Sequence, residues 1–167
     1  MPAMAEQTLE AVRKSVTVDA DPETAFRVFT DDFDSWWPRS HHLGNTPMTR
    51  GIIERGKGGR CYTQHEAGNE VDWGTVLVWE PPHRLVFSWQ IAADWKCEPD
   101  LSRASEVEVR FTPAEGGRTR VDLEHRHFER MAAGAEAMRA GVNAEGGWGT
   151  LLKLFSDRVD TIRSQPR

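Results

Sequence analysis

The clearest hydrophobic pattern in the chain predicts one long helix near the C-terminus, over residues 143–163. Large apolar residues recur there at the i, i+3, i+4, i+7 spacing of one helical face, namely Trp148, Leu151, Leu152, Phe155, Val159 and Ile162. Burial of each such side chain contributes about 1.5 to 3 kcal/mol, so this face must pack against another element. The glycines Gly146, Gly147 and Gly149 indicate a close backbone approach, a hinge, or a merely irregular start of the helix.

Alternation of apolar and polar residues predicts that most of the preceding chain is β-strand. The expected strands are residues 12–18, 50–55, 60–66, 71–80, 85–90, 106–112 and 120–127. Residues 71–80 are apolar on both sides, which predicts a central strand covered on part of each face, where a homodimer contact is one option. In the last strand Val121, Leu123, His125 and His127 share one face.

Two short helices are expected between the first and second strands. Asp21, Pro22 and Glu23 form a typical helix start, and a second helix from residue 31 or 32 through Trp37 is stopped by Pro38. Residues 38–47 are expected to form a loop, 91–103 a lid, and 129–140 a short helix. The order predicts an α+β fold, a curved antiparallel sheet wrapped around the long helix, in one domain over residues 11–167 after a flexible tail 1–10.

Composition narrows the function classes. The net charge is −5 without a basic cluster, which argues against nucleic-acid binding. No apolar run is long enough for a signal peptide or a membrane span, so a cytoplasmic protein without a membrane partner is expected. The two cysteines, Cys61 and Cys97, are read as reduced thiols. Seven tryptophans in 167 residues supply rigid aromatic surface for a core or for a pocket.

Several motifs, in this order, resemble one known family. They are Trp36-Trp37-Pro38, Gly58-Gly59-Arg60, Trp73-Gly74-Thr75-Val76, residues 80–89, residues 117–128 and Gly147-Trp148. Together they resemble the START-like, or SRPBCC, helix-grip superfamily, which includes the birch-pollen allergens. The branch is similar to the C-terminal domain of the activator of the ninety-kilodalton heat-shock chaperone's ATPase. The resemblance implies a helix-grip fold with an apolar cavity between the last helix and the sheet, used for small hydrophobic molecules.

The leading hypothesis is therefore a binding protein for a small apolar molecule, with no cofactor and no catalytic residue assigned. The expected ligand-binding residues are Trp36, Trp37, His41, Trp89, Trp95, His125, Trp148, Leu152 and Phe155. Core packing is the alternative for each tryptophan, whereas His125 and His41 are expected to hydrogen-bond a polar end of the ligand. Two other functions stay open: a chaperone-binding domain, implied by the resemblance, and a polyketide-cyclase-like or hydrolytic enzyme.

Candidate chemistry is otherwise sparse. His125 and His127, two apart on a strand, could hold a metal with His41, His42 or His65, but the spacing supplies no third ligand and no metal site is assigned. Glu66, Asp72 and Arg110 are interpreted as solvated charges on the outer face of the sheet. The chain has no nucleophile elbow, phosphate-binding loop or dinucleotide fingerprint.

Overall fold

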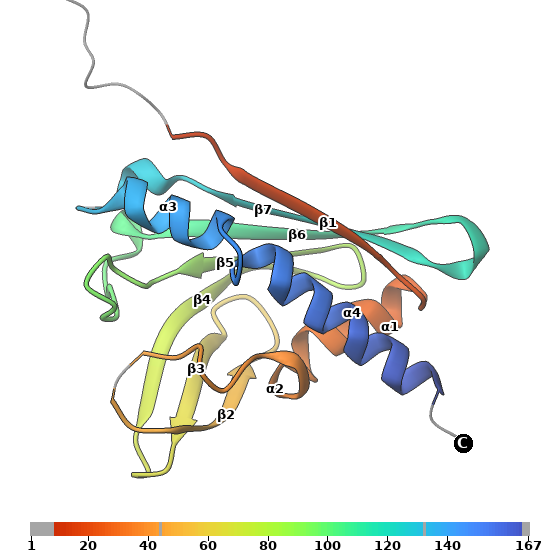
Figure 1. The fold of residues 1–167 in the computed structure, drawn as a ribbon, viewed down its shortest axis with the longest axis horizontal. Helices are drawn as coiled ribbons and strands as arrows, with labels where there is room; N and C mark the ends of the chain where they lie inside the picture. Colours follow the sequence, from red (N-terminus) through yellow and green to blue (C-terminus); the bar gives the residue numbers. More distant parts are fainter. Residues whose placement is uncertain (1–8, 44, 132, 165–167) are drawn as a thin grey trace, which may run out of the picture.

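The computed structural model describes residues 9–43, 45–131 and 133–164. Its main elements are β1 (Val12–Val18), α1 (Pro22–Thr30), α2 (Phe33–Trp36), β2 (Met48–Ile53), β3 (Arg60–His65), β4 (Glu70–Glu80), β5 (Arg84–Trp89), β6 (Ser105–Pro113), β7 (Thr119–Arg126), α3 (Ala135–Asn143) and α4 (Trp148–Ser164). Single 3-10 turns lie at Leu101–Arg103, Glu115–Gly117 and Phe128–Arg130. The predicted α+β helix-grip fold is confirmed, with two short helices after the first strand (Figure 1).

Within the described residues, seven strands form one antiparallel sheet in the order β1-β7-β6-β5-β4-β3-β2. Consecutive strands from β2 to β7 are neighbours, and only β1 crosses over to pair with β7. The register shifts in the β2–β3, β3–β4 and β4–β5 pairs, and such irregularities bend a sheet. In Figure 1 the β2–β4 half turns away from β6 and β7, and α4 crosses the concave side. As predicted, β4 is a central strand.

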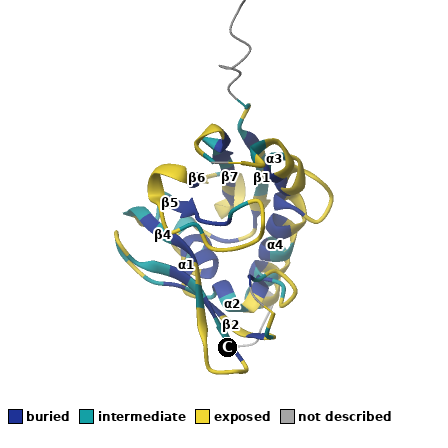
Figure 2. Cartoon of the chain, turned by 90° about the vertical axis from the view of Figure 1, so that its left-hand side faces the viewer, coloured by how far each residue is buried: buried dark blue, intermediate teal, exposed yellow. Residues whose placement is uncertain are grey.

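The long helix buries its apolar stripe. Trp148, Leu151, Leu152, Phe155 and Val159 are each at most 3% exposed, and α4 contacts β1, α1 and α2. Figure 2 shows the buried sides of α4 and of the strands facing one another. The first helix starts as its sequence predicts, because the Asp21 carboxylate accepts a hydrogen bond from the backbone N–H of Thr24 at 2.8 Å.

The predicted start of the long helix is wrong. Asn143 ends α3, and α4 begins at Trp148. Gly146 adopts φ +90°, and a Cβ on Gly147 would lie 2.1 Å from the backbone oxygen of Val142. The glycines therefore allow the backbone between α3 and α4 to fold back closely on the end of α3. The helix expected within 129–140 begins only at Ala135, after a 3-10 turn.

Candidate functional site

An aromatic pocket opens where the loop after α2, the ends of β4 and β5, and residues 91–97 come together. Its volume is about 370 Å³ and its lining residues are Trp37, Ser40, His41, His42, Leu43, Trp73, Trp89, Ile91 and Trp95. In Figure 1 these elements meet on the left-hand side, and Figure 2 looks onto that side. Four tryptophans with a few polar groups are typical of a site for a small, mainly apolar molecule.

The Trp36-Trp37-Pro38 motif divides its two rings between core and pocket. Trp36 ends α2 and packs against Phe155 with 5.6 Å between ring centroids. Trp37 has left the helix, with ψ 127°, and its ring lies parallel to that of Trp73, 5.8 Å away. The Trp37 indole N–H donates to the backbone oxygen of His41 at 2.7 Å, which links the two ends of this loop segment beside the pocket.

The wall that the sheet contributes consists of Trp73 from β4 and Trp89 from β5, whose ring centroids are 5.8 Å apart. The strands approach closely beside them, because a Cβ on Gly74 would lie 2.4 Å from the backbone oxygen of Ser88. Next to this wall the Gln90 side chain accepts hydrogen bonds from Thr75 and Ser88, both at 2.7 Å.

Residues 91–97, the first half of the predicted lid, border the pocket. Ile91 pairs with Cys97 in an isolated bridge, and the Gln90 amide donates to the backbone oxygen of Glu98 at 3.0 Å. Trp95 at the tip is 62% exposed and adopts φ +62°. This left-handed conformation costs a non-glycine residue about 1 to 2 kcal/mol, so folding alone does not favour tryptophan here.

Two histidines supply polar groups at the pocket rim. His41 Nε2 lies 3.3 Å from the backbone oxygen of Gly146, which can only accept, so this nitrogen donates and Nδ1 accepts from Ser40 at 3.1 Å. His42 Nδ1 donates to the backbone oxygen of Leu43 at 3.0 Å. The lone pair of His42 Nε2 therefore has no hydrogen-bond partner among the described residues.

Five of the expected ligand-binding residues are buried in the core and are not among the pocket-lining residues. They are Trp36, His125, Trp148, Leu152 and Phe155, each at most 5% exposed. The structure brings the other four, Trp37, His41, Trp89 and Trp95, together at the pocket. Trp73, Ile91, Leu43, Ser40 and His42 complete the lining without having been expected there. Trp73 was not among the expected ligand-binding residues because residues 71–80 are apolar on both sides of the strand. The alternation pattern therefore does not show which face lines a pocket.

His125 is a structural histidine with a fixed tautomer. The Trp148 indole N–H donates to Nδ1 of His125 at 3.0 Å. An indole nitrogen cannot accept, so Nδ1 holds the lone pair, and Nε2 carries the proton that bonds Ser105 Oγ at 2.8 Å. A base would need its lone pair on the serine side, so Ser105 and His125 do not form an activated nucleophile. Burial lowers the pKa of His125 to about 3.

The predicted pairing of His125 with His127 on one strand face is wrong. β7 ends at Arg126, and His127 follows in a left-handed conformation with φ +66°. Its imidazole lies 3.7 Å from the Glu129 carboxylate, outside the core. Among the described residues no group of three or more metal-ligating side chains is present.

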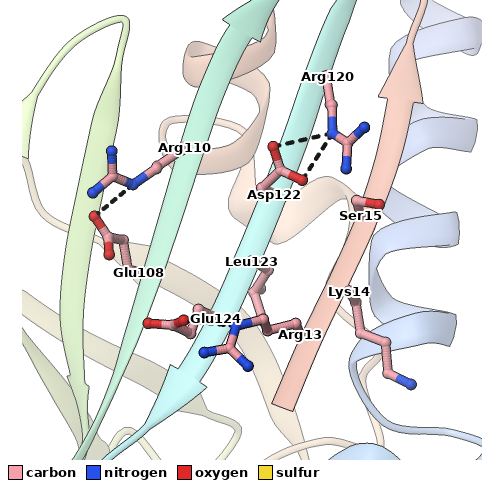
Figure 3. A pocket seen from close by; sticks show the side chains of 9 residues that line it. All are labelled: Arg13, Lys14, Ser15, Glu108, Arg110, Arg120, Asp122, Leu123 and Glu124. Carbon is pink, nitrogen blue, oxygen red and sulfur yellow. Dashed lines mark hydrogen bonds and ion pairs between the residues drawn. The ribbon is translucent and has the colours of Figure 1, made fainter. Parts of the chain in front are cut away.

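A larger groove of about 500 Å³ lies on the sheet face turned away from α4 (Figure 3). Apart from Lys14, its charged side chains form ion pairs with one another: Arg13 with Glu124, Arg110 with Glu108, and Arg120 with Asp122. The outward direction predicted for Arg110 is confirmed, since its side chain is 61% exposed. Because charged side chains form its walls, this groove is a poorer candidate for an apolar ligand than the aromatic pocket.

One family model and several solved structures are similar to this chain over most of its length. The family model described as "Activator of Hsp90 ATPase homolog 1-like protein" matches residues 19–160. One similar solved structure is that of an anthrahydroquino-γ-pyrone synthase, Txn09, complexed with SUM. Its sequence is 39% identical, the alignment covers 90% of this chain and 97% of the Txn09 chain, and the TM-score is 0.63. The self-sacrificing resistance protein CalC from Micromonospora echinospora is 33% identical in sequence. The alignment covers 94% of this chain and 98% of the CalC chain, with a TM-score of 0.66.

A more distant structure agrees in fold alone. Protein NE0264 from Nitrosomonas europaea is 14% identical over 93% of this chain and 97% of that one, with a TM-score of 0.64. No curated protein matches the chain. In the part of the chain that the structure describes, no helix is long and apolar enough to cross a membrane.

Proposed function

The chain belongs to the family of activator of Hsp90 ATPase homolog 1-like proteins, and on this premise we propose that it binds a small, mainly apolar molecule in the aromatic pocket. The fold is one that typically holds hydrophobic ligands. The observation that carries the proposal is the pocket of about 370 Å³ whose lining includes Trp37, Trp73, Trp89 and Trp95. Burial of apolar ligand surface against these rings would supply the free energy of binding.

Trp95 supports the proposal independently of the pocket's shape. A large apolar side chain, 62% exposed and in a left-handed conformation, stabilises the free protein little. Over a bound ligand, the same ring would become buried and would close the pocket. We therefore assign it the role of a ligand contact on the segment 91–97.

A matched pair of variants tests the pocket. The fluorescent probe 1-anilinonaphthalene-8-sulfonate should bind the wild-type protein, and Trp95→Ala should weaken that binding roughly tenfold through loss of buried aromatic surface. Leu101→Ala is the control, because Leu101 is also exposed and close in sequence but does not line the pocket. Equal affinities for all three proteins would refute the assignment. Native mass spectrometry of the purified protein would additionally reveal a co-purified ligand.

An enzymatic role is the second candidate, favoured by one observation. His42 lines the pocket with a free Nε2 lone pair, as a general base requires, and the similar protein Txn09 is named a synthase. A bound molecule recovered with unchanged mass and chromatographic retention would argue for binding alone. Conversion that is lost in His42→Gln, with binding retained, would establish catalysis. A chaperone partner and a homodimer stay predictions.

A further inference from the structure

The buried tryptophans differ in whether their indole N–H groups have partners. Trp36 donates to the backbone oxygen of Val28 at 3.1 Å, Trp37 to that of His41, and Trp148 to His125 Nδ1. The N–H groups of Trp73 and Trp89 have no hydrogen-bond partner among the described residues, although these side chains are only 4% and 6% exposed. Both unpartnered donors belong to the pocket wall.

Such donors are unusual inside a protein. Burying an N–H without an acceptor costs about 1 to 3 kcal/mol, and nearly all buried polar groups have partners. The neighbours of Trp73 and Trp89 include further aromatic rings. The plane of the Phe87 ring lies at 87° to that of Trp73, and the plane of the Trp148 ring at 63° to that of Trp89. Aromatic faces are weaker acceptors than oxygen atoms, so these neighbours leave most of the donor capacity unused.

Resting on the proposed function, we infer that the ligand of this pocket is a mainly apolar molecule with a carbonyl or similar acceptor oxygen, which binds the indole N–H groups of Trp73 and Trp89. One carbonyl oxygen has two lone pairs and can accept from both donors. The apolar body of the ligand packs against the remaining pocket wall. The pocket thereby selects for an oxygen atom as well as for apolar surface, because a hydrocarbon would leave both donors unpaired.

Access to these donors requires movement of the pocket wall. Both indole nitrogens are covered in the free protein. Trp73 is stacked on Trp37, which belongs to the loop after α2 and not to the sheet. Displacement of this loop residue separates the two rings, and the ligand then inserts beside Trp73. The Trp37 bond to His41 lies within the same loop and can move with it once the hydrogen bond from His41 Nε2 to the backbone oxygen of Gly146 breaks.

The test compares two compounds of nearly identical shape, 9-fluorenone, which has a carbonyl oxygen, and fluorene, which has none. Affinities are measured by titration followed by ¹H–¹⁵N NMR of the indole groups. The wild-type protein should bind fluorenone more tightly. Trp73→Phe and Trp89→Phe should each reduce this preference, the ratio of the two affinities, about three- to tenfold. The loss of ring surface weakens both compounds alike and cancels in the ratio. Trp36→Phe is the matched control and should keep the preference, because its N–H already has an acceptor and its ring does not line the pocket.

The NMR signals also provide a measurement that needs no substitution. In the wild-type protein the indole protons of Trp73 and Trp89 should move to lower field with fluorenone and not with fluorene. Equal binding of both compounds, with unmoved indole protons, would overturn the oxygen contact and leave the apolar pocket intact. Failure of both compounds to bind would overturn the proposed function and this inference together.

Discussion

Because His125 is buried in its neutral form, we predict that this protein loses stability in mild acid. The imidazole is fully buried, accepts from Trp148, and has its pKa lowered to about 3 by burial. In the unfolded chain the pKa returns to about 6.5. Between these pH values the imidazole is protonated in the unfolded state and neutral in the folded state. The free energy of unfolding therefore falls as the solution is acidified through this window.

The size of the effect follows from the two pKa values. Each pH unit inside the window corresponds to about 1.4 kcal/mol. Acidification from pH 7 to pH 5 covers about one and a half pH units below the unfolded pKa of about 6.5. His125 alone should therefore lower the free energy of unfolding by about 2 kcal/mol. That is a large part of the 5 to 15 kcal/mol that stabilises a typical domain.

Urea unfolding of three proteins at pH 7, 6 and 5 tests this reasoning. His125→Gln should be less stable at pH 7, because ring packing such as the 4.5 Å centroid contact with Phe128 is lost, but its pH dependence should be shallower by about 2 kcal/mol. His83→Gln removes an exposed histidine and should retain the wild-type pH dependence. If wild type and His125→Gln lost equal stability between pH 7 and pH 5, a neutral buried His125 would be refuted.

Three further substitutions probe other contacts. Burial alone would raise the pKa of Glu108, but hydrogen bonds from Arg84 and Arg126 lower it, so Glu108→Gln should cost about 1.5 to 3 kcal/mol in urea melts at pH 7. The loss should fade as the pH falls below the ordinary glutamate pKa of about 4.3, because the unfolded carboxylate takes up a proton there and the folded carboxylate, whose pKa is lowered, does so at lower pH. Gly74→Ala should cost about 1 to 3 kcal/mol by thermal unfolding, because its Cβ would meet a backbone oxygen at 2.4 Å. Trp95→Gly should stay within about 1 kcal/mol of wild-type stability, since relief of the left-handed conformation offsets glycine's chain entropy, yet bind the fluorescent probe more weakly.

The fold was predictable because its strongest signals are local and repeat along the chain. The apolar stripe of α4 and the alternation in β6 and β7 each require one buried face, and together they leave few architectures. The start of α4 was less predictable. Whether residues 143–147 continue a helix depends on the close approach at Gly147 to Val142, and helical periodicity does not encode it.

The candidate site was only partly predictable, because adjacent aromatic residues can face opposite environments. Trp36 and Trp37 are neighbours, yet one ring reaches the core and the other the pocket, since the helix ends between them. His125 was expected at the ligand, but its two hydrogen bonds to Trp148 and Ser105 satisfy it inside the core.

The aromatic core and the pocket wall are continuous, and burial does not divide them. Trp148 lies 5.4 Å from Trp89 and 6.1 Å from Trp37 between ring centroids, so no boundary appears in packing or in exposed fraction. The indole N–H of Trp148 is satisfied by the protein, whereas that of Trp89 is not. A ring whose donor is already paired can only pack, while an unpaired buried donor gains from a partner that the chain does not supply. We therefore propose that, among the buried tryptophans, Trp73 and Trp89 offer a ligand hydrogen bonds, whereas Trp37 offers it packing alone.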